Sequence, residues 1–134
     1  MDYPIKIGGL KIGWINFCLT TNEKWSNHWK LFCDEEGIQL SVIDQHSQYE
    51  NTNQLDLILI TMDDVDRGAT LFLTELKKHV NLPIIYWVSF YSNKDKLALV
   101  LAGAKDVANK YYLADDMRSE LLKSLGKLQI RQNI

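Results

Sequence analysis

The chain has 134 residues, of which 46% are hydrophobic and 24% are charged. This length and composition are typical of one folded domain and exclude a disordered, collagen-like or largely membrane-embedded protein, so we expect residues 1–134 to form a single domain. Fifteen basic and 17 acidic residues give a formal net charge of −2, which does not favour binding to nucleic acid or to anionic lipid.

Cysteine content and the lengths of the apolar runs indicate the compartment. Only Cys18 and Cys33 occur, and a disulfide framework would need more cysteines, so we expect two free thiols in a reducing environment. The longest apolar runs, 55–60 and 84–88, are far shorter than the ~20 residues of a membrane-spanning helix, and no signal-peptide pattern is visible. The sequence therefore predicts a cytoplasmic protein without membrane contact.

The first part of the chain alternates between strand and helix patterns. Residues 11–17 (KIGWINF) are apolar and rich in β-formers, which predicts a strand. A helix is expected next, because the hydroxyls of residues 20–21 can cap it and large side chains recur at helical spacing: Trp25, Trp29, Phe32 and Cys33. Gly37 is expected to end this helix, and 38–43 (IQLSVI) to form a second strand. The polar stretch 44–54 lacks apolar periodicity, so a second helix is poorly marked.

The middle of the chain contains the strongest strand signal. Residues 55–60 (LDLILI) form a nearly unbroken aliphatic run, which is typical of a strand covered on both faces. An acidic loop, 62–68, follows. The next segment carries a helical apolar stripe made by Phe72, Leu73, Leu76 and Val80. Pro83 prevents this helix from continuing, and a fourth strand is expected at 84–88.

The last part repeats the alternation. A helix is predicted over 94–102, with Gly103 ending it, and a short strand over 105–109. The final helix shows apolar residues at helical spacing: Met117, Leu121, Leu125 and Leu128. Five such alternations favour an α/β fold with a parallel sheet and helices on both faces. Ligands of such sheets approach the carboxyl ends of the strands, here Asn16, Thr61, Val88 and Lys110.

Three segments resemble the receiver domains of bacterial two-component response regulators, and the resemblance spans most of the chain. Residues 56–61 (DLILIT) are similar to the third strand of that family and 83–85 (PII) to the start of its fourth. Residues 103–110 (GAKDVANK) match the family's glycine-to-lysine spacing. The resemblance implies a flavodoxin-like, five-stranded parallel sheet in the order 2-1-3-4-5, which agrees with the alternation.

The resemblance also implies which chemistry to look for. Receivers accept a phosphoryl group from a phosphohistidine onto an aspartate that ends the third strand, beside a divalent cation held by acids at the end of the first. The acceptor position falls on Thr61, whose neutral hydroxyl is a poor acceptor without a general base. The acidic pair falls on Asn16 and Phe17, and neither is a good Mg²⁺ ligand. We therefore expect no catalysis, no metal site and no cofactor.

Two further family positions show a mixed pattern. The position of the switch hydroxyl falls on Val88, with Ser89 as the neighbour that would replace it if the strand end shifts by one residue. Lys110 matches the family lysine outright. The proline that follows the lysine in the family is Tyr111 here, so we expect a trans peptide bond and a changed direction of the lysine. With no phosphoryl group to bind, Lys110 is expected to pair with an acid of the loop at 63–66.

The leading hypothesis is a pseudo-receiver, a non-catalytic module of a bacterial two-component-type pathway that acts by phosphorylation-independent protein–protein interaction. Receivers commonly pair or dock partners through their fourth helix, fifth strand and fifth helix, which would span roughly 94–127 here. A homodimer is one form that this contact can take. The residues expected to contribute anchors and charge on this face are Tyr111, Tyr112, Met117, Lys123 and Lys127. Aromatic residues are also expected near the former phosphate pocket, where they would favour one fixed conformation: Phe17, Phe90, Tyr111 and Tyr112.

Two alternatives stay open. In the first, Asp63 or Asp64 replaces the missing acceptor, and Asp63, Asp64 and Asp66 bind a cation; the opposing interpretation is a solvated acidic loop, since no second acidic segment completes an oxygen ligand set. In the second, the chain is a flavodoxin-like module that binds a small ligand or an anion at the strand ends.

Overall fold

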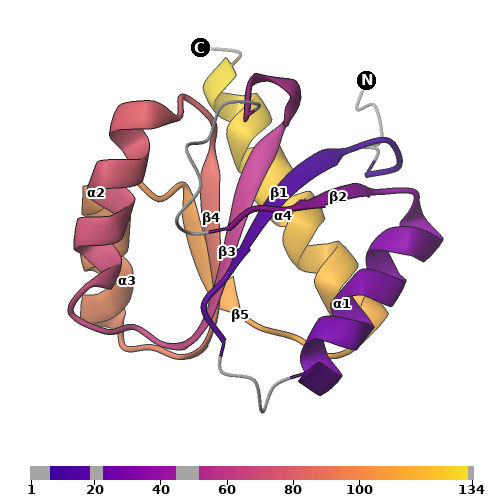
Figure 1. Cartoon of the computed structure of the whole chain (residues 1–134), viewed down its shortest axis with the longest axis horizontal. Coiled ribbons are helices and arrows are strands. Elements are labelled where there is room, and N and C mark those ends of the chain that lie inside the picture. Colours follow the sequence, from indigo (N-terminus) through magenta and orange to yellow (C-terminus); the bar gives the residue numbers. More distant parts are fainter. Residues whose placement is uncertain (1–6, 19–22, 45–51, 133–134) are drawn as a thin grey trace.

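Five parallel strands form one sheet in the order β2-β1-β3-β4-β5 (Figure 1). The structure, a computed structural model, describes residues 7–18, 23–44 and 52–132. In chain order the strands are β1 Lys11–Asn16, β2 Gln39–Val42, β3 Leu57–Asp64, β4 Ile84–Phe90 and β5 Asp106–Asn109. All four neighbouring pairs are parallel, which confirms the predicted flavodoxin-like 2-1-3-4-5 sheet.

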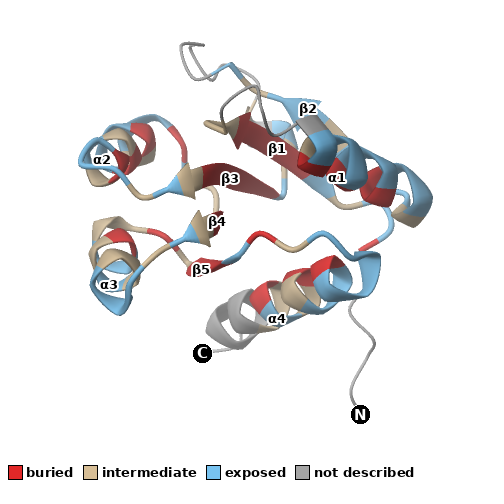
Figure 2. Ribbon diagram, turned by 90° about the horizontal axis from the view of Figure 1, so that it is seen from below, coloured by how far each residue is buried: buried red, intermediate tan, exposed pale blue. Residues whose placement is uncertain are grey.

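Helices cover both faces of this sheet. In the described part of the chain they are α1 Glu23–Glu36, α2 Ala69–His79, α3 Asn93–Ala102 and α4 Ala114–Gln132. Helices α1 and α4 lie on one face, and α2 and α3 on the other (Figure 2). The prediction of a doubly covered α/β sheet is therefore confirmed. Among the described helices, none has the length and apolar character that crossing a bilayer requires.

Two helix ends lie where glycines predicted them. Gly37 follows α1 with φ +74°, and Gly103 follows α3 with φ +124°. Both values lie in the left-handed region, which glycine enters without the steric penalty of a Cβ atom. The start of α3 is fixed as well, because the Ser92 side chain accepts from the Asp95 amide while the Asp95 carboxylate accepts from the Ser92 amide.

The central strand β3 is buried on both faces, as the aliphatic run at 55–60 indicated. Leu57 and Leu59 belong to the core under α1 and α4. Ile58, Ile60 and Met62 belong to the core under α2 and α3. Successive side chains of a strand point to opposite faces, so an unbroken apolar run fills two cores at once.

Tryptophan dominates the core on the α1 and α4 side. Trp25 and Trp29 of α1 stack with ring centroids 6.1 Å apart, and Trp87 of β4 meets Trp29 edge-on at 5.1 Å. All three are buried, as predicted for the residues of α1. Aromatic pairs of this kind add about 0.5–1.5 kcal/mol each beyond the area they bury. The result is a rigid aromatic wall behind the ends of β1 and β3.

Ile43 and Leu55, which flank the β2–β3 connection, pack closely against Gly13 of β1. A Cβ atom at Gly13 would lie 2.5 Å from Ile43 Cδ1 and 2.6 Å from Leu55 Cδ1, so a larger residue would require these two side chains to shift. A 3₁₀ turn at Thr52–Gln54 precedes β3. The rest of the poorly marked helix at 44–54 lies largely outside the described residues.

Strands β3 and β4 are both longer than the sequence indicated. Their pairing continues past Met62, opposite Val88, to Asp64, opposite Phe90. Met62 is 6% exposed and packs into the core under α2, which ties the extension down. As a result, Asp63 and Asp64, which were expected in a loop, belong to β3 and help to form the crevice described next.

Candidate functional site

The candidate site lies where the carboxyl ends of β1 and β3 meet the segment after β5. Asn16 is paired with Thr61 across β1 and β3. The expectation that Thr61 closes the third strand is wrong, because β3 continues to Asp64. Thr61 and Asp63 are two positions apart on a strand, so their side chains project from the same face. The crevice therefore contains a carboxylate, that of Asp63, which lies two positions beyond Thr61 in β3.

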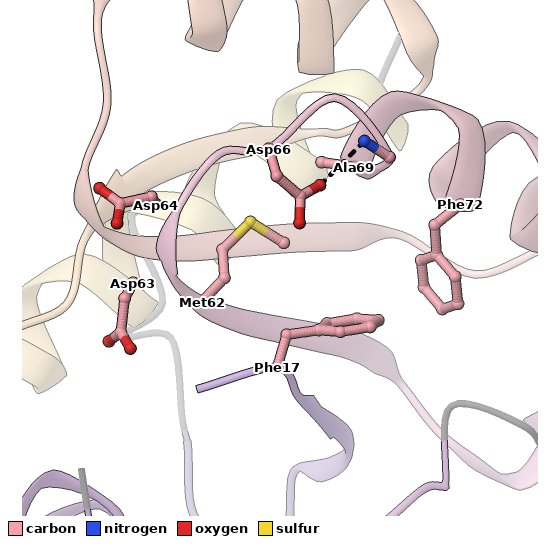
Figure 3. Close-up of a pocket in the computed structure, with 8 residues that line it drawn as sticks. Phe17, Met62, Asp63, Asp64, Asp66, Ala69 and Phe72 are labelled. Carbon is pink, nitrogen blue, oxygen red and sulfur yellow. Dashed lines mark hydrogen bonds between the residues drawn. The ribbon is translucent and has the colours of Figure 1, made fainter. Parts of the chain in front are cut away.

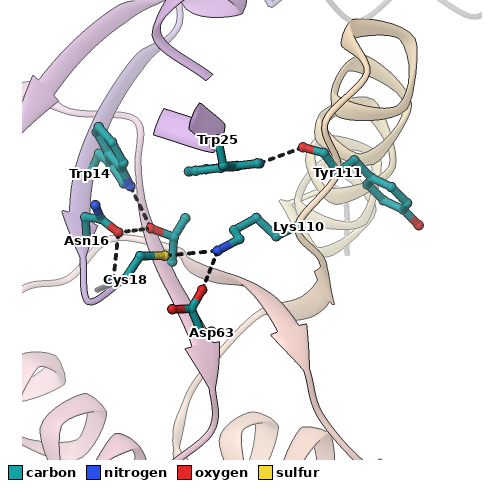
Figure 4. Close-up of polar contacts among 8 residues, drawn as sticks. Trp14, Asn16, Cys18, Trp25, Asp63, Lys110 and Tyr111 are labelled. Atoms are coloured by element: carbon teal, nitrogen blue, oxygen red, sulfur yellow. Dashed lines mark hydrogen bonds and ion pairs between the residues drawn. The ribbon is translucent and has the colours of Figure 1, made fainter. Parts of the chain in front are cut away.

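Thr61 itself is locked into the core. It is fully buried, and its hydroxyl accepts from Trp14 Nε1 at 2.9 Å and donates to Asn16 Oδ1 at 2.9 Å (Figure 4). A hydroxyl has one proton to donate, and this one is taken by Asn16. The geometry gives Thr61 a structural role and leaves it neither exposed nor beside a base.

Asn16 and Phe17, which the resemblance aligned with an acidic pair, both have structural contacts. Asn16 Oδ1 accepts from Thr61 and from the Cys18 amide, at 3.0 Å, so it shapes the turn after β1. The Phe17 ring meets Phe72 of α2 edge-on, with centroids 4.9 Å apart. An amide oxygen held by two donors and a benzyl ring do not supply the anionic oxygens that Mg²⁺ prefers.

Lys110 points into the crevice and is held by three groups. Its Nζ donates to Asp63 Oδ1 at 2.8 Å and to Cys18 Sγ at 3.1 Å, and it lies 5.3 Å from the centroid of the Trp25 ring (Figure 4). Its side chain is 0% exposed, against 29% for Asp63. The predicted ion pair with an acid of the loop is confirmed, and Asp63 is the acid. No cis peptide bond occurs among the described residues, so the bond to Tyr111 is trans as expected.

The charge states at this site follow from burial and pairing. Burial lowers the pKa of Lys110, but the hydrogen bonds to Asp63 and Cys18 outweigh it, and the pKa is raised overall. Burial raises the pKa of Cys18, which the hydrogen bond from Lys110 only partly offsets. At neutral pH the crevice therefore holds a protonated lysine beside a protonated thiol. Cys18 and Cys33 are both free cysteines, as predicted.

The three acids after Thr61 diverge instead of converging. Asp63 is paired with Lys110, Asp64 is exposed, and Asp66 Oδ1 accepts from the Gly68 amide at 2.9 Å just before α2 (Figure 3). Across the described residues, no three His, Cys, Asp or Glu side chains are grouped so that they could hold a metal ion. The alternative in which these acids jointly bind a cation is therefore not supported by the geometry.

A pocket of about 430 Å³ opens beside the crevice, at the start of α2. Its walls combine apolar and acidic side chains (Figure 3). The residues that line it are Phe17, Met62, Asp63, Asp64, Asp66, Gly68, Ala69 and Phe72. Of the four aromatic residues expected near the former phosphate pocket, Phe17 lines this pocket, and Phe90, Tyr111 and Tyr112 do not. Phe90 is 70% exposed and Tyr112 is 48% exposed, because the extended β4 carries Phe90 beyond the core and Tyr112 lies on the surface before α4.

The two candidates for the switch position differ in environment. Val88 is fully buried in the core under α2 and α3, and its carbonyl accepts from the Lys110 amide at 3.2 Å. Ser89 is half-buried and lines a shallow hollow together with Asp64 and Asn109. The only hydroxyl of the pair, that of Ser89, therefore belongs to the residue that lines this hollow.

The predicted interaction face is only partly on the surface. Tyr112 and Lys123 are exposed, and Tyr111 is half-buried, with its carbonyl accepting from Trp25 Nε1 at 2.6 Å. Met117 is fully buried in the core under α4, so it cannot anchor a partner; its position in the helical apolar stripe was the signal that it faces inward. The side chain of Lys127 lies outside the described residues.

Sequence reasoning missed an exposed apolar stripe on α3. Leu97 and Leu101 are 58% and 78% exposed, and Val100 between them is also exposed. The buried side of the same helix is formed by Leu99. A signal was present, because residues 97–102 (LALVLA) are apolar all round and one helix face cannot bury them all.

No protein-family model matches the sequence, and no curated protein matches it either. Several solved structures share its fold. A two-component response regulator from Clostridium difficile has a TM-score of 0.64 at 17% identity, over 89% of this chain and 98% of that one. An orphan response regulator of H. pylori has a TM-score of 0.61 at 15% identity, over 88% and 98%. A signal receiver domain from Vibrio parahaemolyticus has a TM-score of 0.67 at 14% identity, over 92% and 95%. The chain therefore has the receiver fold.

Proposed function

We propose that this chain is a signalling module with the receiver fold that acts through protein–protein contact and does not depend on phosphorylation. The observation that carries the proposal is the ion pair between Lys110 and Asp63, 2.8 Å apart. In receivers the corresponding lysine contacts the phosphoryl oxygens. Here Asp63 of the same chain already neutralises the lysine, so the crevice contains a negative charge without phosphoryl transfer.

The surroundings of the pair support a fixed state. Thr61 at the acceptor position is buried with its proton committed to Asn16, and Phe17 replaces an acid with an aromatic ring. Among the described residues of the crevice, Lys110 is paired with Asp63 and the Thr61 hydroxyl with Asn16, so neither group is available to bind a phosphate. We infer that it is not an enzyme and that it works by presenting one conformation to its partner.

The partner surface that we favour includes α3 and the segment before α4. Leu97 and Leu101 of α3 and Tyr112 are exposed, and exposed apolar and aromatic side chains are characteristic of interface cores. A second copy of the chain is one candidate for the partner. Response regulators among the structural neighbours support a pathway of the two-component type, and two free thiols support a cytoplasmic location.

A second candidate function is phosphoryl acceptance by Asp63. The observation that favours it is that Asp63, unlike Asp64, lies within hydrogen-bonding distance of Lys110 in the crevice. Against it, the partner acids that would hold Mg²⁺ are replaced by Asn16 and Phe17. The sequence offered Asp63 and Asp64 equally as acceptors. Asp64 is exposed and projects from the opposite face of β3.

Labelling with a small phosphodonor separates the two functions. The protein is incubated with acetyl phosphate and Mg²⁺ and its intact mass is measured, with Asp63→Asn and Asp64→Asn variants alongside. We expect no phosphoryl adduct on any of the three proteins. An adduct on the wild type that disappears in Asp63→Asn and persists in Asp64→Asn would establish the acceptor function and overturn the phosphorylation-independent one.

A further inference from the structure

We propose that Cys18 and Lys110 are a site of oxidative modification, at which a peroxide converts their contact into a covalent sulfur–nitrogen bond, a sulfenamide. The bond is a property of this chain alone and can be measured without any partner. Its regulatory meaning rests on the proposed function, because the oxidised module would present a different charge at its strand ends to a partner protein.

The first argument is the distance between the two reacting atoms. Lys110 Nζ lies 3.1 Å from Cys18 Sγ (Figure 4). Intramolecular reactions are strongly accelerated when the reacting atoms are held about 3–3.5 Å apart. The nitrogen is fixed in this place, because it also donates to Asp63 at 2.8 Å and the lysine side chain is 0% exposed. Nitrogen and sulfur are therefore in position before an oxidant arrives.

The second argument is the difference between the two cysteines. Cys18 is half-buried, so a molecule as small as hydrogen peroxide can reach its sulfur from solvent. Cys33 lies in the core under α1 and α4, and burial raises its pKa to about 12, so its thiolate is scarce and it is a poor partner for a disulfide. In the described part of the chain, the nitrogen that contacts Cys18 Sγ is that of Lys110.

The first step is oxidation of the sulfur. The Cys18 thiolate attacks one oxygen of the peroxide, so that the S–O bond forms and the O–O bond breaks. The sulfur loses two electrons, the peroxide is reduced, and its second oxygen leaves as water with the proton of the thiol. The product is a sulfenic acid on Cys18. The ammonium group of Lys110 favours the thiolate that this step needs, because it donates to the sulfur.

The second step is condensation with the lysine. Asp63 accepts a proton from the Lys110 ammonium along the 2.8 Å hydrogen bond, which frees the lone pair of the nitrogen. The amine attacks the sulfur, so that the N–S bond forms and the S–O bond breaks. The departing hydroxide takes a second proton from the nitrogen and leaves as water, as in the condensation of other sulfenic acids with nitrogen. Asp63 returns its proton to solvent, and the chain has lost two hydrogen atoms.

Oxidation changes the charge of the crevice. The nitrogen of the sulfenamide carries no positive charge, so the carboxylate of Asp63, which is 29% exposed, loses its cation. The bond also joins the turn after β1 to the residue that follows β5. The reduced and oxidised chains therefore differ in negative charge at the carboxyl ends of the strands, a difference that a charged partner can detect.

Intact-mass spectrometry measures the product. The protein is treated with hydrogen peroxide at about pH 8, because burial raises the pKa of the Cys18 thiol and its thiolate is scarce at neutral pH. We expect a loss of about 2 Da that dithiothreitol reverses, and a Cys18–Lys110 linkage in tandem spectra of the digested protein. An added oxygen without this loss, a bond to any other residue, or an unchanged mass would each overturn the inference.

Variants assign the bond. Lys110→Arg keeps a cation beside Asp63 but has no amine, so we expect at least about tenfold less of the cross-linked product. Lys78→Arg, which replaces a lysine with a side chain 62% exposed, is the matched control and should give as much product as the wild type. Cys33→Ala should also keep the product, whereas a disulfide between Cys18 and Cys33, which has the same mass, would disappear.

The outcomes also separate this inference from the proposed function. Product that persists in Lys110→Arg or disappears in Cys33→Ala would show that a different bond forms and would contradict the inference. A phosphoryl adduct on Asp63 after treatment with acetyl phosphate would instead overturn the proposed function, while the sulfur–nitrogen bond would still stand.

Discussion

Lys110 Nζ lies 2.8 Å from Asp63 Oδ1, so the buried ammonium group is neutralised by a carboxylate two positions beyond Thr61. The pair is tied into its surroundings by Cys18 Sγ, 3.1 Å from the same nitrogen, and by the ring of Trp25. Because the anion, Asp63, is part of the chain, the charge of Lys110 is balanced within the fold. The predictions below test what the pair and its neighbours contribute.

Removing the carboxylate should destabilise the fold. Asp63→Ala leaves the ammonium group of Lys110, whose side chain is 0% exposed, without its anionic partner, and we expect the free energy of unfolding to fall by about 1–3 kcal/mol. Urea denaturation followed by tryptophan fluorescence measures it. Glu75→Gln removes the exposed Glu75–Lys78 pair of α2 and is the control that should show no measurable change. Equal effects of the two variants would contradict a buried, stabilising pair.

The same pair predicts a loss of stability at alkaline pH. The pKa of Lys110 is raised in the folded state above its ordinary value of 10.5. Such a group contributes its full stabilisation below the unfolded pKa, and the contribution disappears as pH rises through the folded pKa. The free-energy difference between wild type and Lys110→Met should therefore be constant from neutral pH to about pH 10 and shrink above it. A difference that grows with rising pH would show that the sign is wrong.

The hydroxyl of Thr61 is predicted to be needed for structure. Thr61→Val keeps the shape but leaves the indole N–H of Trp14 without its acceptor, which should cost about 1–3 kcal/mol of unfolding free energy. Thr61→Ser keeps the hydroxyl and is expected to be closer to wild type, since it loses only a methyl group. Chemical denaturation of the three proteins decides between them. If the valine variant is as stable as the serine variant, the hydrogen bonds of Thr61 do not stabilise the fold.

Reactivity should distinguish the two cysteines. Burial raises the pKa of Cys33 to about 12, so its thiolate is scarce at pH 8, whereas Cys18 is only half-buried. A maleimide reagent at pH 8 is therefore expected to add once to the native protein and twice in urea. The variant Cys18→Ser should take up no reagent in the native state. A native Cys18→Ser protein that still reacts rapidly would show that Cys33 is accessible.

The exposed stripe of α3 is predicted to be the contact surface. Leu101→Glu places a charge on a side chain that is 78% exposed, so it should weaken self-association or partner binding at least about tenfold without lowering stability. Leu31→Glu is the matched control, because Leu31 is 55% exposed on α1, on the opposite face of the sheet. Sedimentation velocity over a concentration series measures self-association. If Leu31→Glu and Leu101→Glu have the same effect, or neither has any, α3 is not the interface.

The amino-acid sequence by itself determined the frame of this protein. The alternation of strand and helix and the helix ends at Gly37 and Gly103 were predictable, because each depends on local periodicity or backbone freedom. The strand order 2-1-3-4-5 was predictable only through the resemblance to the receiver family. The pairing of Lys110 with a nearby acid was predictable from the acidic character of the loop after Thr61. The residue type at each position and the sign of a loop's net charge are visible in a sequence without coordinates.

Only the tertiary structure decided which acid meets Lys110. The length of β3 depends on its pairing with β4 as far as Asp64, and a strand's side chains alternate between faces, so the strand end determines whether Asp63 or Asp64 turns into the crevice. Contacts between residues far apart in the chain settle this outcome, and a local pattern does not contain it. Met117 is a different case, because its position in the apolar stripe of α4 already indicated the core in which the structure places it.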